Sequence, residues 1–487
     1  MPKKLPYIKN LRTAQNDELF SDGLTMGTVV MGKQGSGKTS WLARIIVWLF
    51  KNFPKRTFFI LDPSGSLTDS ILLLILQEPF EVRESLLGRI IYADLGNKDI
   101  VVPLPSFSPS YGTSYEEQAQ LLARCFQRLA PHLVQQAPVL GGLPLQETAP
   151  ELFRLLCAIK DEQGGGWQVT EAKRLLLDLG LLRFALNEFG GSVPEAKWYF
   201  ERDFLSKDMS RHERELRTHT LRAMLGMIEP REVRAMLGYP KPGFTPKEAI
   251  DNGSLVLICG EKLTNNAPAQ HFLFTFIFLL IMATINQRRP GDPNDNPVML
   301  VADEVYALLK IYGMAEEIGT VAPLYRSRKL ELVIVLQALW QLEKELQDKI
   351  WNLGNKVCFG IENHNEAYDI SKQLFHYDPR TVKSPATSDH SQAIYEPDRG
   401  QYLEQANWIQ SLKHREMIMR RYMSEQKPDP YIRHVERTAE NPNGAVKDQL
   451  ESLKLWLLGK RGISVTDALA VINKRNFVST PKKPKSV

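Results

Sequence analysis

The chain has 487 residues, 43% of them hydrophobic, so it is long enough for two or three domains with apolar cores. Its 61 basic and 56 acidic residues leave a net charge of +5, which alone indicates neither a nucleic-acid nor a membrane partner. The four cysteines lie far apart and form no C-x-x-C pair, which argues against a zinc site or a disulfide framework and favours a cytoplasmic protein.

The first segment that carries chemistry is GKQGSGKTS, residues 32–40, which fits the phosphate-binding pattern G-x-x-x-x-G-K-[ST]. TVVM before it predicts a strand, and WLARIIVWLF after it predicts a helix whose N-terminus faces the phosphates. We expect Lys38 to contact the β and γ phosphates of ATP and Thr39 to bind Mg²⁺ through its hydroxyl. The predicted nucleotide-binding residues are Gly32, Gln34, Gly35, Ser36, Gly37, Lys38, Thr39 and Ser40.

Strand and helix patterns alternate through the first hundred residues, which predicts an α/β fold with a mostly parallel sheet and helices on both faces. After the P-loop, strand patterns occur at TFFILD and RIIYADL. Between residues 112 and 240 the patterns are helical and are separated by Pro-rich or Gly-rich breaks. Strand patterns then return at GSLVLICG, PVMLVADE, ELVIVLQ and KVCFGI, so we expect the sheet to be completed after a helical insertion.

These patterns predict four parts. They are a first part of the ATPase core at 1–111, an all-helical insertion at 112–240, a second part of the core at 241–440, and a basic helical tail at 441–487. The longest apolar run, FLFTFIFLLIMATI, has 14 residues. As a helix it would be about 21 Å long, against about 30 Å of hydrocarbon, so we expect a buried core helix and no membrane span.

The basic charge is concentrated at the end of the chain. From Lys447 to Val487 there are nine basic and three acidic side chains, a net charge of +6. Two interpretations remain open: a solvated tail, or a segment that holds nucleic acid through its phosphates.

The strand pattern PVMLVADE ends in two carboxylates, Asp303 and Glu304. The apolar residues before them predict a buried strand that points toward the P-loop. We expect Asp303 to hold Mg²⁺ and Glu304 to activate the attacking water. The adjacent glutamate favours ATP turnover over a slow binary switch.

A third segment, YRSRKLELVIVLQ, places Arg326 and Arg328 before a strand that ends at Gln337. A glutamine at the tip of the strand next to the Asp303 strand is suited to sensing the γ phosphate. A nearby arginine is suited to supplying positive charge across a subunit boundary.

The order of these segments resembles the HerA/FtsK superfamily of P-loop ATPases. It is most similar to the conjugative coupling ATPases of type IV secretion and their soluble relatives, over about residues 25–370. The resemblance implies a RecA-like core, an all-helical insertion, a hexameric ring and ATP-driven movement of DNA. By the same match Arg326 is the first choice for an arginine finger and Arg328 the second, and Asp62 occupies a family acidic position near the nucleotide.

The leading expectation is therefore an ATP-hydrolysing DNA translocase that forms a cytoplasmic homo-hexamer and uses ATP and Mg²⁺. One alternative is an ATP-regulated assembly or recruitment protein. The other is a conjugative coupling protein that selects a protein–DNA substrate, with a relaxase, nuclease or secretion-apparatus partner. Coupling proteins usually begin with membrane-spanning helices, whereas here the P-loop strand starts after 27 residues, so we expect a motor without an intrinsic membrane span.

Overall fold

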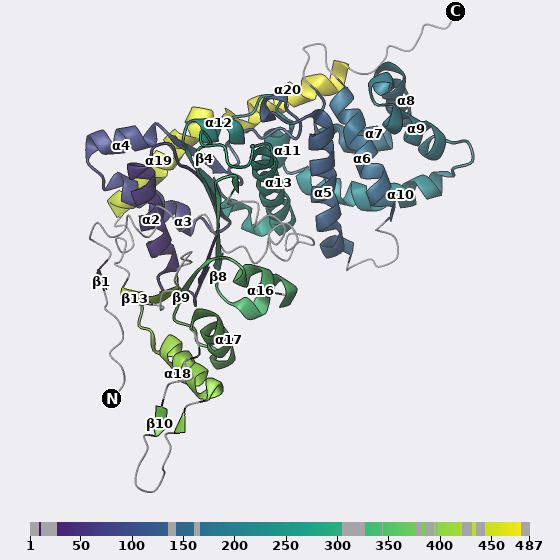
Figure 1. Cartoon of the computed structure of the whole chain (residues 1–487). Coiled ribbons are helices and arrows are strands. Elements are labelled where there is room, and N and C mark those ends of the chain that lie inside the picture. The colour runs from purple at the N-terminus through teal and green to yellow at the C-terminus, as the bar shows by residue number, and fades with distance from the viewer. Residues whose placement is uncertain are drawn as a thin grey trace, which may run out of the picture.

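The computed structural model describes residues 9–10, 27–134, 143–159, 166–303, 327–342, 344–375, 377, 382–384, 394–395, 397–420, 431–434 and 444–478. A ten-stranded sheet forms its centre, in the order β1-β13-β12-β9-β2-β8-β7-β3-β6-β4 (Figure 1). The seven strands from β9 to β4 are all parallel. Their bounds are β2 Thr28–Met31, β3 Thr57–Asp62, β4 Ile90–Asp94, β6 Leu255–Cys259, β7 Val298–Ala302, β8 Leu330–Leu336 and β9 Asn355–Phe359. The predicted α/β fold with a mostly parallel sheet is confirmed.

The path of the chain explains why helices cover both faces of this sheet. From β2 to β3 and on to β4 the chain moves toward one edge, and from β6 through β7 and β8 to β9 it moves toward the other. Crossovers between parallel strands are right-handed, so the two directions place their helices on opposite faces. Figure 1 shows this division. The first group contains α2 Lys38–Asn52, α3 Ser66–Leu76 and α4 Phe80–Leu87, and the second contains α13 Ala267–Asn286 and α16 Lys344–Trp351.

Helix α13 contains the apolar run, and it is buried along almost its whole length. Among the described residues it alone has the length and apolarity to cross a membrane, but 83% of its most apolar window is buried inside the protein. Phe272 of this helix contacts Phe126 of the helical region, with ring centroids 5.2 Å apart. The predicted buried core helix is confirmed.

A helical region follows β5 (Ile100–Val101) and ends before β6. It packs on α13 and on its own core, where Phe126 and Phe153 lie with their ring centroids 5.3 Å apart. A capping box at Ser210 and Glu213 fixes the start of its most polar helix, α10. The helices are α5 Tyr115–Val134, α6 Leu143–Ala158, α7 Ala172–Leu177, α8 Leu179–Phe189, α9 Pro194–Tyr199, α10 Arg211–Leu225 and α11 Arg231–Gly238; α12 Pro246–Asp251 then leads into β6.

The sheet extends beyond β9 by strands that the sequence patterns did not predict. β12 (Glu416–Arg420) pairs antiparallel with β9, β13 (Tyr431–His434) pairs antiparallel with β12, and β1 (Lys9–Asn10) lies at the edge. Helices α17 (His364–Leu374) and α18 (Asp398–Ser411) connect β9 to β12. A small hairpin of β10 (Val382–Ser384) and β11 (Ile394–Tyr395) projects beyond α18 (Figure 1).

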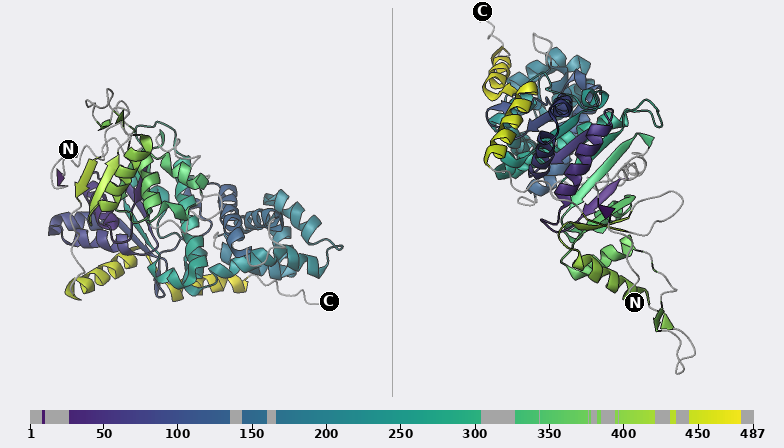
Figure 2. Two further views of the ribbon diagram at one scale, coloured as in Figure 1. Left: turned by 90° about the horizontal axis from the view of Figure 1, so that it is seen from below. Right: turned by 90° about the vertical axis from the view of Figure 1, so that its left-hand side faces the viewer.

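The end of the described chain forms a strap across the molecule, residues 444–478, made of α19 (Gly444–Arg461), β14 (Ile463–Ser464) and α20 (Val465–Val478). β14 pairs with β5, and Figure 2 shows the two yellow helices running along both the α/β part and the helical region. Several of its basic side chains have internal partners. Arg461 pairs with Glu248 at 2.8 Å, and Arg475 donates to the carbonyls of Gly166 and Gly238.

Candidate nucleotide-binding site

The P-loop connects the carboxyl end of β2 to the first residue of α2, as the sequence predicted. Gly37 occupies the N-cap of α2 with a φ of 108°, a left-handed conformation that glycine adopts without a steric cost. A Cβ atom on Gly32 would lie 2.6 Å from the Cβ of Phe359, so this position also requires glycine. The loop therefore depends on glycine at both ends for its shape.

The side chain of Lys38 folds back across the loop. Its Nζ donates hydrogen bonds to the carbonyl oxygens of Gly32, at 2.5 Å, and Lys33, at 2.9 Å. The residue is buried, with 8% of its surface exposed. The ammonium group thus lies against the inside of the loop, where a phosphate would be held.

The polar groups of the loop fit an anion. Helix α2 has no side-chain cap at its N-terminus and no acidic residue in its first turn, which leaves the positive end of the helix dipole facing the loop. The Ser36 hydroxyl is buried and has no hydrogen-bond partner among the described residues. Thr39 and Ser40 are half-buried in the first turn of α2, whereas Gln34 and Gly35 are exposed at the loop tip.

Asp303 and Gln337 follow the carboxyl ends of β7 and β8, the same end of the parallel strands at which the P-loop follows β2. β8 is placed between β2 and β7, with Met31 opposite Leu336 and Ala302 opposite Ile334. Gln337 is therefore level with the first glycine of the loop. Asp303, which directly follows Ala302, is level with the last residues of the strands on either side of β7. Asp303 is buried, with 3% exposed, and its backbone N–H donates to the carbonyl of Leu61 at 3.0 Å.

This donor set suits Mg²⁺ bound together with a nucleotide. Within the part of the chain that the structure describes, no group of three or more His, Cys, Asp or Glu could hold a metal ion alone. The Thr39 hydroxyl and the Asp303 carboxylate are hard oxygen ligands, and Mg²⁺ in such sites takes its other ligands from phosphate and water. Glu304 and Arg326, two further predicted site residues, lie outside the described residues.

Asp62 is fully buried at the end of β3 and is used by the turn that follows it. Its carboxylate accepts hydrogen bonds from the backbone N–H groups of Gly65, at 2.8 Å, and Thr68, at 2.7 Å, and from the Ser64 hydroxyl. Burial raises the pKa of Asp62, and these hydrogen bonds oppose the rise. The structure thus places this carboxylate at the start of α3, where it holds the backbone of the turn between β3 and α3.

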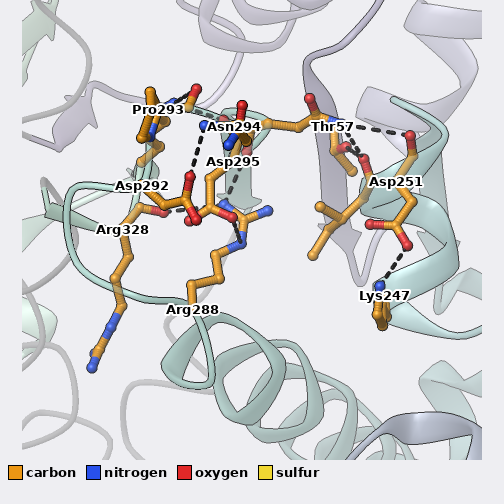
Figure 3. Close-up of polar contacts among 12 residues, drawn as sticks. Thr57, Lys247, Asp251, Arg288, Asp292, Pro293, Asn294, Asp295 and Arg328 are labelled. Carbon is orange, nitrogen blue, oxygen red and sulfur yellow. Dashed lines mark hydrogen bonds and ion pairs between the residues drawn. The ribbon is translucent and has the colours of Figure 1, made fainter.

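Arg328 lies at the amino ends of the strands, whereas the P-loop lies at their carboxyl ends. It precedes β8, whose seven residues at roughly 3.3 Å each place about 23 Å of strand between Arg328 and Gln337. Its guanidinium donates to the Asn286 side chain at 2.8 Å, and its carbonyl accepts from Arg288 at 3.1 Å. Figure 3 shows the Arg328 side chain pointing away from the neighbouring Asp292–Asp295 loop. Within one chain, Arg328 is therefore remote from the nucleotide site.

Two residues beside the P-loop were not predicted from the sequence. Glu362, just after β9, forms an ion pair with Lys33 at 2.9 Å, and the Lys33 backbone N–H donates to the Gly360 carbonyl at 3.1 Å. Arg415, in the turn before β12, donates its backbone N–H to the Ser36 carbonyl at 3.0 Å. Both come from the segment after residue 361, where the sequence shows a mixed polar pattern without a motif.

Comparison with solved structures shows which known fold this architecture resembles. The solved structure of the conjugative coupling protein TrwBdeltaN70, in its unbound monoclinic form, aligns with a TM-score of 0.54 and 16% identity. The alignment covers 85% of this chain and 87% of that one. The fold is that of TrwB. TrwB in complex with ADP and Mg²⁺ aligns nearly as well, with a TM-score of 0.53, 16% identity and coverage of 86% and 87%.

The second comparison concerns the part of the chain that completes the site. Residues 297–422 match the family model described as the TraM recognition site of TraD and TraG. This range begins with β7 and ends just after β12, so it contains Asp303, Gln337 and Arg415. No curated protein matches the sequence. The predicted resemblance to the coupling ATPases is confirmed by the TrwB fold and by this match.

Proposed function

We propose that this protein is an ATP-hydrolysing coupling ATPase that selects a protein–DNA substrate for transfer. The observation that carries the proposal is the arrangement of Lys38, Asp303 and Gln337 at one edge of a TrwB-like sheet. The match of residues 297–422 to a partner-recognition family model supports a coupling protein over a free-standing DNA motor, which the sequence had placed first.

In the proposed reaction, the P-loop N–H groups and Lys38 bind the phosphates of ATP and orient the γ phosphate. Thr39 and Asp303 would hold Mg²⁺, which supplies charge neutralisation on the phosphate oxygens when it is bound. Glu304 accepts the proton of the attacking water, and Gln337 contacts the γ phosphate from the adjacent strand tip. TrwB has been solved with ADP and Mg²⁺, which supports this choice of ligands.

We propose that hydrolysis requires a cytoplasmic homo-hexameric ring. β8 starts at the amino ends of the strands, whereas the P-loop of the same chain lies at their carboxyl ends. We propose that Arg326, which precedes β8 in the sequence, acts on the nucleotide of a neighbouring subunit. Head-to-tail interfaces close into rings when the rotation between neighbouring subunits permits. The proposed partners are DNA and a DNA-bound protein, such as a relaxase, which residues 297–422 would help to recognise.

ATP turnover with different additions tests the proposal. The rate is measured with the protein alone, with single-stranded DNA, with double-stranded DNA, and with a relaxase–DNA complex, and the Lys38→Ala variant serves as the background. A coupling ATPase gives its highest rate with the protein–DNA complex. A rate raised fully by naked DNA supports the translocase instead, and a rate that no addition changes supports an assembly protein.

A further inference from the structure

A tight turn from the C-terminal part of the core rests on the P-loop. The turn, Lys413–Glu416, connects α18 to β12 and is closed by a hydrogen bond from the Glu416 N–H to the Lys413 carbonyl at 2.9 Å. The Glu416 carboxylate also accepts from the Lys413 N–H at 2.9 Å. Two hydrogen bonds therefore fix the turn's shape from both ends.

Arg415 occupies the third position of this turn with a φ of +71°. Turns with a positive φ only at this position normally carry glycine or asparagine there, because a side chain is strained in the left-handed region. Among the described residues Lys329, with a φ of +53°, is the only other non-glycine residue with a positive φ. Such strain persists only where the surroundings impose it, and it is concentrated at functional sites.

The surroundings that hold Arg415 are the P-loop itself. Its backbone N–H donates to the Ser36 carbonyl at 3.0 Å. A Cβ atom built on Gly37 would lie 3.3 Å from the Arg415 Cα and 3.2 Å from its Cγ. The first atoms of the Arg415 side chain thus lie beside Gly37, the residue that precedes Lys38 at the N-terminus of α2. Arg415 is half-buried there.

We propose that Arg415 is a second phosphate-binding cation, which acts on the nucleotide held by the P-loop of its own chain. The inference rests on the proposed function and adds to it a residue far from the nucleotide motifs in sequence. Arginine suits the role because its planar guanidinium binds phosphate oxygens through two N–H groups, whereas Lys38 acts as a point charge. If the turn had only a structural role, glycine would suit this position better, because it adopts the positive φ without strain.

Replacement by glycine separates the two roles. In Arg415→Gly the left-handed backbone is relaxed, so the melting temperature is expected to stay the same or rise. If the guanidinium binds phosphate, the Kd for ATP with Mg²⁺, measured by calorimetry on the full chain, is expected to rise at least about tenfold. Arg415→Lys keeps the charge but not the paired N–H groups, so an intermediate Kd is expected.

Lys329→Gly is the matched control. Lys329 has the same backbone conformation, but its Nζ donates to the carbonyls of Pro293 and Asp295 at the sheet edge opposite the P-loop. Its replacement by glycine is expected to leave the Kd for ATP unchanged. An Arg415→Gly variant that binds ATP as tightly as the wild type overturns the inference, even if its melting temperature rises.

Two further results keep this inference distinct from the proposed function. If the wild type itself does not bind ATP, or if Lys38→Ala binds it equally well, the proposed nucleotide site is wrong, independently of Arg415. If Arg415 acts within its own chain, mixing Arg415→Gly with Lys38→Ala restores no ATP hydrolysis, because no chain then carries both residues. Recovery of activity in such mixtures would overturn the assignment to the same chain.

Discussion

Lys454 of the strap and Asp69 of α3 form an ion pair with 2.6 Å between the Nζ and Oδ1 atoms. The Lys454 side chain is 9% exposed and also contacts Glu451 at 3.1 Å. The pair fastens the last part of the chain to the helix that follows Asp62. Part of the basic charge predicted as a tail is therefore used to hold the strap on the ATPase core.

Removal of this pair is expected to loosen the strap. Lys454→Ala should lower the free energy of unfolding by about 1–2 kcal/mol, a value discounted because Asp69 is partly exposed. Urea denaturation followed by far-UV circular dichroism measures the change. Lys447→Ala, at an exposed position on the same helix, is the control and is expected to change the free energy of unfolding by less than about 0.5 kcal/mol. Equal values for the two variants would mean that the strap is not held by this pair.

Because basic residues of the strap have partners inside the protein, the choice of truncation site decides whether the tail is tested as a DNA contact. Truncation at Lys447 would remove the strap, whereas truncation after Val478 removes only STPKKPKSV, with Lys482, Lys483 and Lys485. If these lysines contact DNA phosphates, the truncated chain binds more weakly and the slope of log K against log salt falls by up to roughly 2.7 for duplex DNA. Fluorescence anisotropy at several salt concentrations measures this. An unchanged slope identifies these charges as solvated.

A buried contact between an arginine and a glutamate at the amino ends of the strands predicts a pH dependence of stability. Arg56 and Glu331 lie 3.0 Å apart with side chains 7% and 2% exposed, and burial raises the pKa of Glu331 from 4.5 to about 7. Between these values the folded state keeps a proton that the unfolded state loses, so stability is lost as the pH rises through this window.

Glu331→Gln removes that titration. The melting temperature of the variant relative to wild type is expected to rise as the pH is raised from 5 to 8, by differential scanning fluorimetry. Glu404→Gln, at an exposed position on α18, is the control and is expected to follow the wild type at every pH. A Glu331→Gln difference that is constant with pH would show that the carboxyl group does not titrate in this range.

The arginine finger gives a prediction about assembly. If Arg326 acts at the nucleotide of the neighbouring subunit, as proposed, Arg326→Ala is expected to bind ATP, form rings and lose roughly a thousandfold in hydrolysis rate. Mixing it with Lys38→Ala should restore activity, since mixed rings contain interfaces where an intact P-loop meets an intact arginine. Turnover is measured across mixing ratios, with subunit exchange confirmed.

Arg328→Ala is the comparison for this experiment. Because Arg328 ties the start of β8 to Asn286 at the end of α13, its loss should lower the melting temperature, and mixing with Lys38→Ala should restore nothing beyond its own rate. Recovery with Arg328→Ala and none with Arg326→Ala would transfer the finger to Arg328.

The sequence was sufficient where local chemistry determines structure. The β2 strand TVVM and the β3 strand TFFILD have their predicted bounds, because apolar and β-branched runs next to glycine, proline and charge have few other solutions. The position of Gln337 beside the P-loop followed from the shared direction of parallel strands. These features depend on neighbours along the chain or on a repeated geometric rule.

The sequence was insufficient where distant segments meet. β12 has a short strand pattern, EMIMR, inside a polar region, and its burial depends on pairing with β9. The contact of Arg415 with Ser36 arises only from that pairing, so no local pattern marks it. For the same reason, no pattern in the basic C-terminal segment predicted that Lys454 would form an ion pair with Asp69.

ATP binding and ATP hydrolysis by two variants, measured side by side, test the central claim that this sheet edge binds and hydrolyses ATP. Lys38→Ala should lose both, because the phosphates lose their cation. Glu304→Gln should bind ATP as the wild type does and hydrolyse it at a small fraction of the wild-type rate, because the base that accepts the proton of water is gone. A Glu304→Gln variant that hydrolyses ATP at the wild-type rate, or a Lys38→Ala variant that retains binding and turnover, would contradict the account.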